Sequence, residues 1–249
     1  QLSELHPEAQ RFFHEPPANS HTTMVVMTSN RGLCGALNVN VARTVMSELE
    51  LRGKENTEVI CLGKKGVQIL SSFGVQVALA YDKDDTAATD TSLVDLSDLL
   101  YKKFLEKLTD HVVIVYPHFE SAIKQQPVMR MLYPFPKFIP EHLSDESTNE
   151  PSANDNGIEN GEHLYEPNAV SVLEYLIPRY GEIILYQALL ESNASEHSAR
   201  MVSMKNATDA AKDMATELTL EFNKARQASI TKEIAEIASG AAALEQSSF

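Results

Sequence analysis

Apolar and polar positions alternate in recognisable periods along the first half of the chain. Residues 22–29 form a short, β-branched apolar run followed by turn-forming residues at 30–32, which is typical of a buried strand. Between residues 37 and 51, apolar side chains recur every three or four positions, and Gly53 follows as a stop signal. The first elements predicted are therefore a strand and an amphipathic helix.

The same alternation of strand and helix continues to about residue 133. The pattern predicts strands at residues 58–62, 75–80 and 111–116, helices at 64–72 and 92–108, and a less regular strand at 126–133. Strands that alternate with helices are joined by crossover connections, so the sheet should be mainly parallel and covered by helices. The sequence predicts a Rossmann-like α/β domain over residues 22–136.

An acidic, polar segment interrupts this pattern between Pro140 and Pro167. It contains eight acidic residues and no Lys or Arg, and residues 144–161 are rich in Ser, Asn, Gly and Pro. Such a composition cannot bury enough apolar surface to form a core. We interpret residues 137–166 as a solvated, flexible insertion, in preference to an acidic docking motif.

The rest of the chain is predicted to form one long helix. Residues 182–239 contain neither Gly nor Pro and are rich in helix-forming residues. Such a helix would be about 87 Å long, whereas a compact domain of about 150 residues is only about 30–40 Å across. Pro178 and Gly181 should kink or interrupt the helix upstream. We assign residues 167–249 to a C-terminal helix that reaches beyond its own domain.

An apolar seam with alternating spacings of four and three residues follows this helix, as in a coiled coil. Its first run consists of Leu190, Ala194, His197, Met201, Met204, Thr208, Ala211, Ala215, Leu218, Phe222 and Ala225. A second run, in a shifted register, consists of Ile230, Ile234, Ile237, Ala241 and Leu244. One helix cannot bury this seam alone.

Composition and charge exclude several classes of function. Hydrophobic residues make up 43% of the chain and charged residues 22%, as in ordinary globular proteins, but the net charge is −14. Such a surface repels phosphate, so neither nucleic-acid binding nor a polybasic membrane anchor is expected. No stretch is long and apolar enough to span a bilayer. Cys34 and Cys61 lie in apolar runs, which indicates buried free thiols and a reducing compartment.

Sequence motifs for catalysis or cofactor binding are weak. SNRGLCGALN at residues 29–38 could hold an anion at a helix N-terminus, but it lacks G-x-G-x-x-G. GKKG at residues 63–66 lacks the spacing of a P-loop. No His/Cys cluster has metal-ligand spacing. We expect no catalytic residue, cofactor or metal, and interpret the glycines as tight packing, while a nucleotide-binding enzyme remains an alternative.

Polar residues on the long helix form the most informative cluster. It consists of Ser195, Glu196, Arg200, Lys205, Asn223, Lys224, Arg226, Gln227, Ser229 and Thr231. Arg and Gln offer multidentate hydrogen bonds that suit the carboxylates of a partner. By composition alone, a solvated helix face is equally compatible, and so is a generic coiled-coil adaptor.

Three segments resemble the gamma subunit of the bacterial F-type ATP synthase. The C-terminal segment at residues 191–244 resembles the end of that subunit, most specifically in the block from KARQASIT to SGAAAL at residues 224–244. SNRGLCGALN is similar to the family's SDRGLCGGLN, and residues 163–192 resemble the segment that leads into its C-terminal helix. The matches extend from about residue 22 to residue 244, and the chain is identified as a member of this family.

The resemblance implies a non-catalytic subunit that forms the rotating central stalk of the synthase. In the family, the C-terminal helix pairs with an antiparallel N-terminal helix, which is missing before Gln1. Residues 1–21 would then be a linker remnant, and the chain a fragment or an incomplete gene model. A stiff, uneven shaft would couple proton flow through the membrane ring to ATP synthesis or hydrolysis.

The resemblance also implies partners and contact residues. We expect the alpha, beta and epsilon subunits and the c-ring as partners, without nucleic acid or direct membrane insertion, at the cytoplasmic face of the bacterial inner membrane. Residues expected to contact the beta subunit are Arg226, Gln227, Thr231 and Glu236 near the catch loop, and Glu196 and Arg200 near its acidic lever segment. Residues expected at the rotor foot, near epsilon and the c-ring, are Tyr165 and Glu166. Residues 240–244 would form the tip of the shaft.

Overall fold

The computed structural model describes residues 11–13, 20–83, 91–135, 166 and 168–246. Contacts divide the chain into two compact units, residues 1–200 and residues 201–249. Nearly all of the predicted acidic insertion, including Tyr165, lies outside the described residues, and only Glu166 of it is described.

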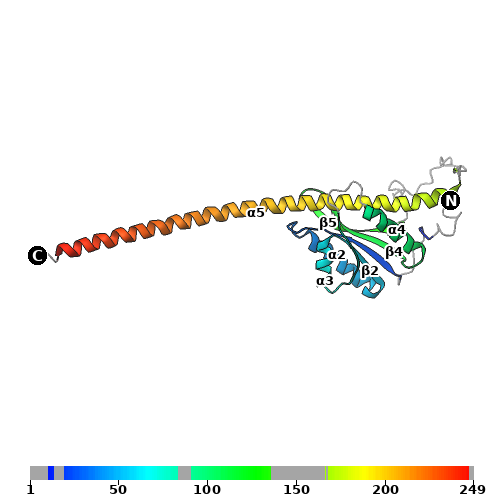
Figure 1. Ribbon diagram of the computed structural model, residues 1–249, viewed down its shortest axis with the longest axis horizontal. Helices are drawn as coiled ribbons and strands as arrows, with labels where there is room; N and C mark the ends of the chain where they lie inside the picture. Colours follow the sequence, from blue (N-terminus) through cyan, green and yellow to red (C-terminus); the bar gives the residue numbers. More distant parts are fainter. Residues whose placement is uncertain (1–10, 14–19, 84–90, 136–165, 167, 247–249) are drawn as a thin grey trace, which may run out of the picture. The chain divides into compact units, whose positions relative to one another are not determined.

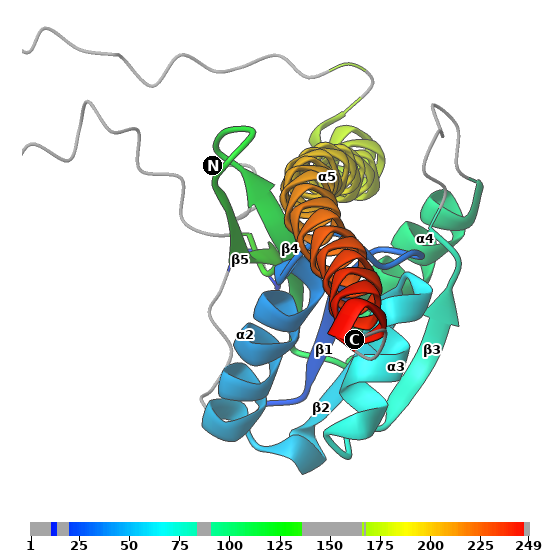
Figure 2. The ribbon, with the colours of Figure 1, turned by 90° about the vertical axis from the view of Figure 1, so that its left-hand side faces the viewer.

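A five-stranded sheet forms the centre of the first unit. Its strands are β1 (Thr22–Met27), β2 (Thr57–Leu62), β3 (Val77–Tyr81), β4 (His111–Phe119) and β5 (Gln125–Tyr133), in the order β3-β2-β1-β4-β5. β1 pairs in parallel with β2 and β4, β2 pairs in parallel with β3, and β5 alone runs antiparallel to its neighbour. Figure 2 shows β3 and β5 at the two edges. The predicted mainly parallel sheet is confirmed.

Helices cover both faces of this sheet. Helices α2 (Leu37–Arg52) and α3 (Lys64–Ser72), joined to β2 and β3 by short connections that include the 3-10 helix η2 (Lys54–Asn56), share one core with the sheet. Helix α4 (Thr91–Leu105) and the first turns of α5 (Ala169–Gln246) share the core on the other face (Figure 1). Alternate residues of β1 enter the two cores, which explains its continuous apolar run.

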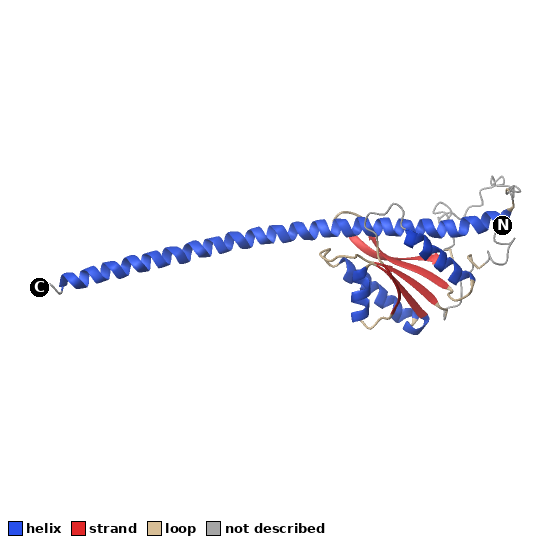
Figure 3. Cartoon of the chain, viewed as in Figure 1, coloured by secondary structure: helices blue, strands red, loops and turns tan. Residues whose placement is uncertain are grey.

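Helix α5 is continuous over 78 residues, which corresponds to about 117 Å at 1.5 Å per residue. The prediction of a long C-terminal helix is confirmed. The helix runs through Pro178 and Gly181 without a break (Figure 3), so the expected interruption at this point is wrong. Leu173 and Ile177 before it, and Ile184 after it, are all buried in the same core. Pro178 has no backbone N–H and cannot donate a helical hydrogen bond, but these contacts hold the turns on either side of it in place.

Gly181 is required by a close approach between α5 and the end of β5. A Cβ atom at this position would lie 2.0 Å from Oη and 3.0 Å from Cζ of Tyr133. The Tyr133 ring is fully buried and packs against Phe12, Phe104 and Phe135, so it cannot move aside. The missing side chain of Gly181 therefore forms a notch for the tyrosine hydroxyl.

Part of the segment predicted as a linker contributes to the core. Phe12 is fully buried, and its carbonyl accepts a hydrogen bond from the Phe135 backbone N–H at 2.7 Å. The Arg11 guanidinium lies over the Phe104 ring, 4.7 Å from its centroid, and forms an ion pair with Asp110 at 3.1 Å. Residues 11–13 thus close the core beside α4 and the end of β5.

Replacing Gly181 by Ala tests the notch. We expect Gly181→Ala to lower the free energy of unfolding by about 1–3 kcal/mol, because the added methyl group overpacks a rigid site. The chain contains no Trp, so urea unfolding is best followed by the near-ultraviolet circular dichroism of its eight tyrosines.

Gly240→Ala is the matched control on the same helix. A Cβ at residue 240 would meet nothing within 4 Å, and Ala favours a helix by up to about 1 kcal/mol over Gly. Combining Gly181→Ala with Tyr133→Phe should restore part of the lost stability, since the phenyl ring lacks the colliding oxygen. Equal stability of the two alanine variants would contradict the notch.

Candidate interaction sites on the C-terminal helix

The carboxyl ends of the strands converge on the last turns of α5 within the first unit. In open α/β sheets, ligands bind at this edge, where the strand order reverses, which here is beside β1. The backbone carbonyl of Gly32, after β1, accepts a hydrogen bond from Arg200 Nε at 3.4 Å. The carbonyl of Pro117, near the end of β4, accepts one from Ser195 Oγ at 2.9 Å. Side chains of α5 thus occupy the position that a ligand takes in related folds.

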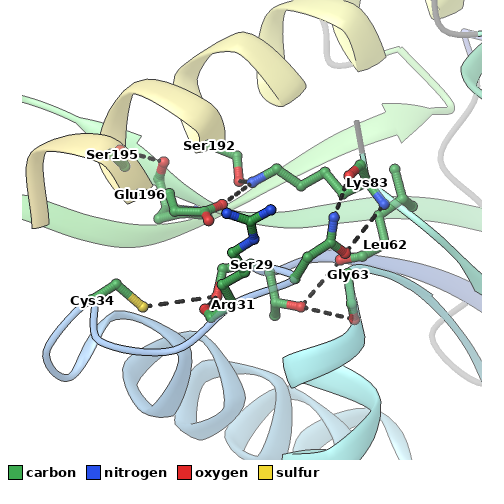
Figure 4. A network of polar contacts seen from close by, with 12 residues as sticks. Ser29, Arg31, Cys34, Leu62, Gly63, Lys83, Ser192, Ser195 and Glu196 are labelled. Carbon is green, nitrogen blue, oxygen red and sulfur yellow. Dashed lines mark hydrogen bonds and ion pairs between the residues drawn. The ribbon is translucent and has the colours of Figure 1, made fainter. Parts of the chain in front are cut away.

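A buried ion pair lies at the centre of this junction. Lys83 follows β3, and its side chain is fully buried, with Nζ 2.8 Å from Glu196 Oε2 and 3.1 Å from Ser192 Oγ. The second oxygen of Glu196 lies 2.7 Å from Arg200 Nη2. Figure 4 shows the Lys83 side chain extending from the sheet edge to Ser192 and Glu196 of α5. Each charge is paired, as burial requires.

The environment keeps Glu196 ionised. Burial raises the pKa of a carboxyl group, but the positive charge and hydrogen bond of Lys83, followed by those of Arg200, outweigh this effect and leave the pKa of Glu196 below its ordinary value of 4.5. The ion pairs therefore stabilise the fold at pH values above 4.5. Their contribution is lost as the pH falls through the lowered pKa.

The turn after β1, which resembles an anion-binding loop, uses its polar groups internally. The Ser29 backbone N–H donates to Asn38 Oδ1 at 3.1 Å, and Asn38 Nδ2 donates to Ser29 Oγ at 2.7 Å. Asn30 Oδ1 accepts from the backbone N–H groups of Lys64 at 3.3 Å and Lys83 at 3.4 Å. These groups tie the loops after β1, β2 and β3 together, and this does not favour a nucleotide site.

The glycines of the GKKG sequence reflect tight packing between the start of α3 and the end of β1. A Cβ at Gly63 would lie 2.3 Å from the Thr28 carbonyl oxygen, and one at Gly66 would lie 2.5 Å from Thr28 Oγ1. That hydroxyl accepts a hydrogen bond from the Gly66 N–H at 2.9 Å. Gly63 also has a φ of +100°, which other residues rarely adopt. Both glycines are thus required by local packing.

In the second unit, most of the helix residues whose burial is described, 201–241, are exposed. The apolar seam is among the exposed residues, including Phe222 at 67% and Ile237 at 73% exposure. The predicted contact residues Arg226, Gln227, Thr231 and Glu236 are all exposed. Gln227 and Thr231, four residues apart, lie on one face of the helix. Glu236 lies 3.8 Å from Lys232 in a solvated pair of little energetic weight.

The two groups of predicted beta-contact residues therefore differ in environment. Glu196 is 1% exposed, and its carboxylate forms ion pairs with Lys83 and Arg200. Its burial therefore does not favour the predicted contact with another subunit. Arg200 is partly exposed, and Glu166 of the predicted foot is exposed. Lys83 was missed by sequence reasoning, because a lysine between acidic residues is typical of a solvated turn.

Comparison with known proteins identifies the family. A family profile described as ATP synthase matches residues 1–244. The ATP synthase gamma chain of Nitrosomonas eutropha is 39% identical over 223 residues, which cover 89% of this chain and 74% of that protein. The gamma chain of Neisseria gonorrhoeae is also 39% identical, over 88% of this chain and 73% of that protein. This chain belongs to the ATP synthase gamma-chain family.

Solved structures agree with this family at the level of the fold. A chain of the Euglena gracilis mitochondrial ATP synthase, in a structure described as OSCP/F1/c-ring, matches with a TM-score of 0.63 and 23% identity over 90% of this chain and 73% of that chain. A chain from the Tetrahymena thermophila central stalk and c-ring structure matches with a TM-score of 0.56 and 23% identity, over 83% and 84% of the two chains. Within the described residues of this gamma-family chain, no helix has the length and hydropathy needed to cross a membrane.

Acid titration tests the buried ion pair. We expect Glu196→Gln to lower the free energy of unfolding at neutral pH by about 3–5 kcal/mol, because it removes the carboxylate that pairs with the buried Lys83 ammonium. The difference from the unaltered chain should be constant above pH 4.5 and should shrink below it, until it is lost as the pH falls through the lowered pKa of Glu196.

Urea unfolding at a series of pH values measures this difference. Glu233→Gln, on the exposed part of α5, is the control and should leave the stability of the α/β domain unchanged. A penalty for Glu196→Gln that stays the same at every acidic pH at which the chain is still folded would rule out an ionised Glu196 as its source.

Proposed function

We propose that this gamma-family chain is the rotating central stalk of a bacterial, proton-translocating F-type ATP synthase and that it is not itself catalytic. Its task is to couple rotation driven by ion flow to ATP synthesis, or ATP hydrolysis to reverse rotation. An uneven shaft presents a different face to each catalytic subunit, so each rotational step favours a different conformation at each site. The relatives named ATP synthase gamma chain, which are 39% identical over 88–89% of this chain, support the proposal.

The observation that carries the proposal is the exposure of helix α5 beyond Arg200. Its apolar seam is exposed, and a contiguous apolar stripe of this length on a soluble protein marks an interaction surface. Small residues such as Ala211 and Ala215 alternate with large ones along it, which suits close approach of a second helix. We propose that an antiparallel helix and the surrounding subunits cover this surface in the assembled enzyme.

The polar residues of the exposed helix suit contacts with a ring of other subunits. We propose that Arg226, Gln227 and Thr231 bind the catch loop of a beta subunit and that Glu236 contacts the same region. The exposed side chains of Arg226, Gln227 and Thr231 can donate to carboxylates and carbonyls of a partner, whereas the exposed Glu236 carboxylate can accept hydrogen bonds. We propose that Arg200 contacts the beta subunit at the lever segment, and that Glu196 acts through the orientation of Arg200.

The remaining partners follow from the same assignment. We propose that Tyr165 and Glu166 lie near the epsilon subunit and the c-ring, and that the stalk binds the alpha and beta subunits at its other end. The chain would then associate peripherally with the cytoplasmic face of the inner membrane through these subunits. The filled crevice at the carboxyl edge of the sheet supports a role without substrate chemistry.

Affinity purification from a bacterium that carries the tagged full-length chain tests the assignment. Mass spectrometry should identify alpha, beta and epsilon subunits in the purified complex, and the complex should hydrolyse ATP. Recovery of unrelated coiled-coil proteins would favour an adaptor, and nucleotide bound stoichiometrically to the isolated chain would favour a Rossmann enzyme.

Single substitutions in the exposed cluster test the beta-subunit contacts. Arg226→Ala or Gln227→Ala should lower ATP turnover of the reconstituted complex by about 10-fold, which corresponds to roughly 1.4 kcal/mol. Assembly should be intact, because most interface residues contribute little individually.

Lys212→Ala is the control, since Lys212 is an exposed cation on the same helix outside the cluster. Turnover is measured by phosphate release, and assembly by gel filtration. Unchanged turnover in both cluster variants would remove the case for these residues.

A further inference from the structure

The last turns of α5 within the first unit are tied to the sheet by directional contacts from several strands. Lys83, after β3, binds Ser192 and Glu196, and the Pro117 carbonyl of β4 accepts from Ser195. These helix residues fall within little more than one turn. The contacts therefore approach the same short stretch of helix from different strands of the sheet.

Directional contacts restrict the helix in a way that its apolar contacts do not. The stripe formed by Leu185, Ala188 and Leu189 is buried against the sheet, but hydrophobic attraction depends on area and has no preferred direction. Hydrogen bonds and ion pairs weaken steeply when their distance or angle changes. A small roll of the helix about its axis would preserve most of the apolar burial but would separate Lys83 Nζ from Glu196 and Ser192.

Stability alone does not explain a fully buried ion pair. An apolar pair of similar volume often stabilises a protein as well or better, whereas a buried pair can specify a single register. Here the buried cation lies just after the edge strand β3 and the anion lies on helix α5, so the pair relates the rotation of the helix directly to the sheet.

We propose that Lys83, Ser192, Ser195 and Glu196 form a torsional lock, a set of positioning residues that fix the rotation of α5 about its own axis against the sheet. The inference rests on the proposed rotor function and deepens it. Torque that passes between this helix and the α/β domain must pass through the turns of the helix that contact the sheet. The lock makes that connection stiff, and the Gly181 notch for Tyr133, about three turns before Ser192, resists sliding along the axis.

Angular fluctuations of the assembled rotor measure this stiffness. The head subunits are fixed to a surface, and a bead is attached to a thiol introduced by Ile123→Cys, a site that is 85% exposed in the connection between β4 and β5. The native Cys34 and Cys61 are buried, so the added thiol is the reactive one. The variance of the bead angle is recorded without ATP and increases as torsional stiffness decreases.

The main variant is Lys83→Met combined with Glu196→Leu, which removes both charges and keeps the apolar volume. We expect the complex to assemble and the angular variance to rise roughly two-fold, because the directional pairing is lost while burial is retained. The matched control is Lys124→Met with Glu120→Leu, which makes the same replacements in an exposed ion pair and should leave the variance unchanged.

A second variant tests the lock even if the first variant does not assemble. Ser192→Ala with Ser195→Ala removes hydrogen bonds to Lys83 and Pro117 with little change in volume, and it should raise the variance in the same direction. Equal variance in the unaltered chain and in every lock variant that assembles would overturn the lock. Failure of the unaltered complex to rotate with ATP would instead overturn the proposed rotor function.

Discussion

Burial of the first turns of α5 against the sheet is the contact on which the rest of the structure depends. Leu173, Ile177, Ile184, Leu185 and Leu189 share one core with α4 and the central strands. Without them, α4 alone would cover that face, and part of a sheet whose central strands are buried on both sides would be exposed to water. The helix that is proposed to carry torque is therefore also a structural layer of the α/β domain, and neither can reorganise independently of the other.

The same contact occupies the edge of the Rossmann-like domain at which such folds bind ligands. Folds of this class bind ligands beside the strand at which the order reverses, and here Ser195, Glu196 and Arg200 of α5 meet the strand ends at that place. The polar groups that could hold a phosphate instead bind one another across three loops. The polar groups at this edge position a helix, so the fold class by itself does not imply ligand binding here.

Local patterns predicted the helices and strands of the α/β domain well. The differences between the predicted and observed ends of these elements have local causes. Helix α4 ends at Leu105, earlier than its apolar period suggests, because Lys107 adopts a positive φ of 60° at the turn that follows. Strand β4 extends to Phe119, beyond the predicted apolar run, because its last residues pair with β5 across the sheet edge. The exposed residues Arg226, Gln227, Thr231 and Glu236 were proposed from a resemblance, and their contacts depend on chains other than this one.

By itself, the sequence determined the mainly parallel sheet, the long C-terminal helix and the family, because periodicity, helix propensity and motifs are properties of neighbouring residues. Only the tertiary structure decided the partners of Lys83, the need for glycine at residue 181 and the place of Phe12 in the core. Each of these depends on residues about 50 to 120 positions apart, which no local pattern relates. A lysine in an acidic turn and a glycine beside a proline acquire their roles only when the chain brings a helix against the ends of the strands.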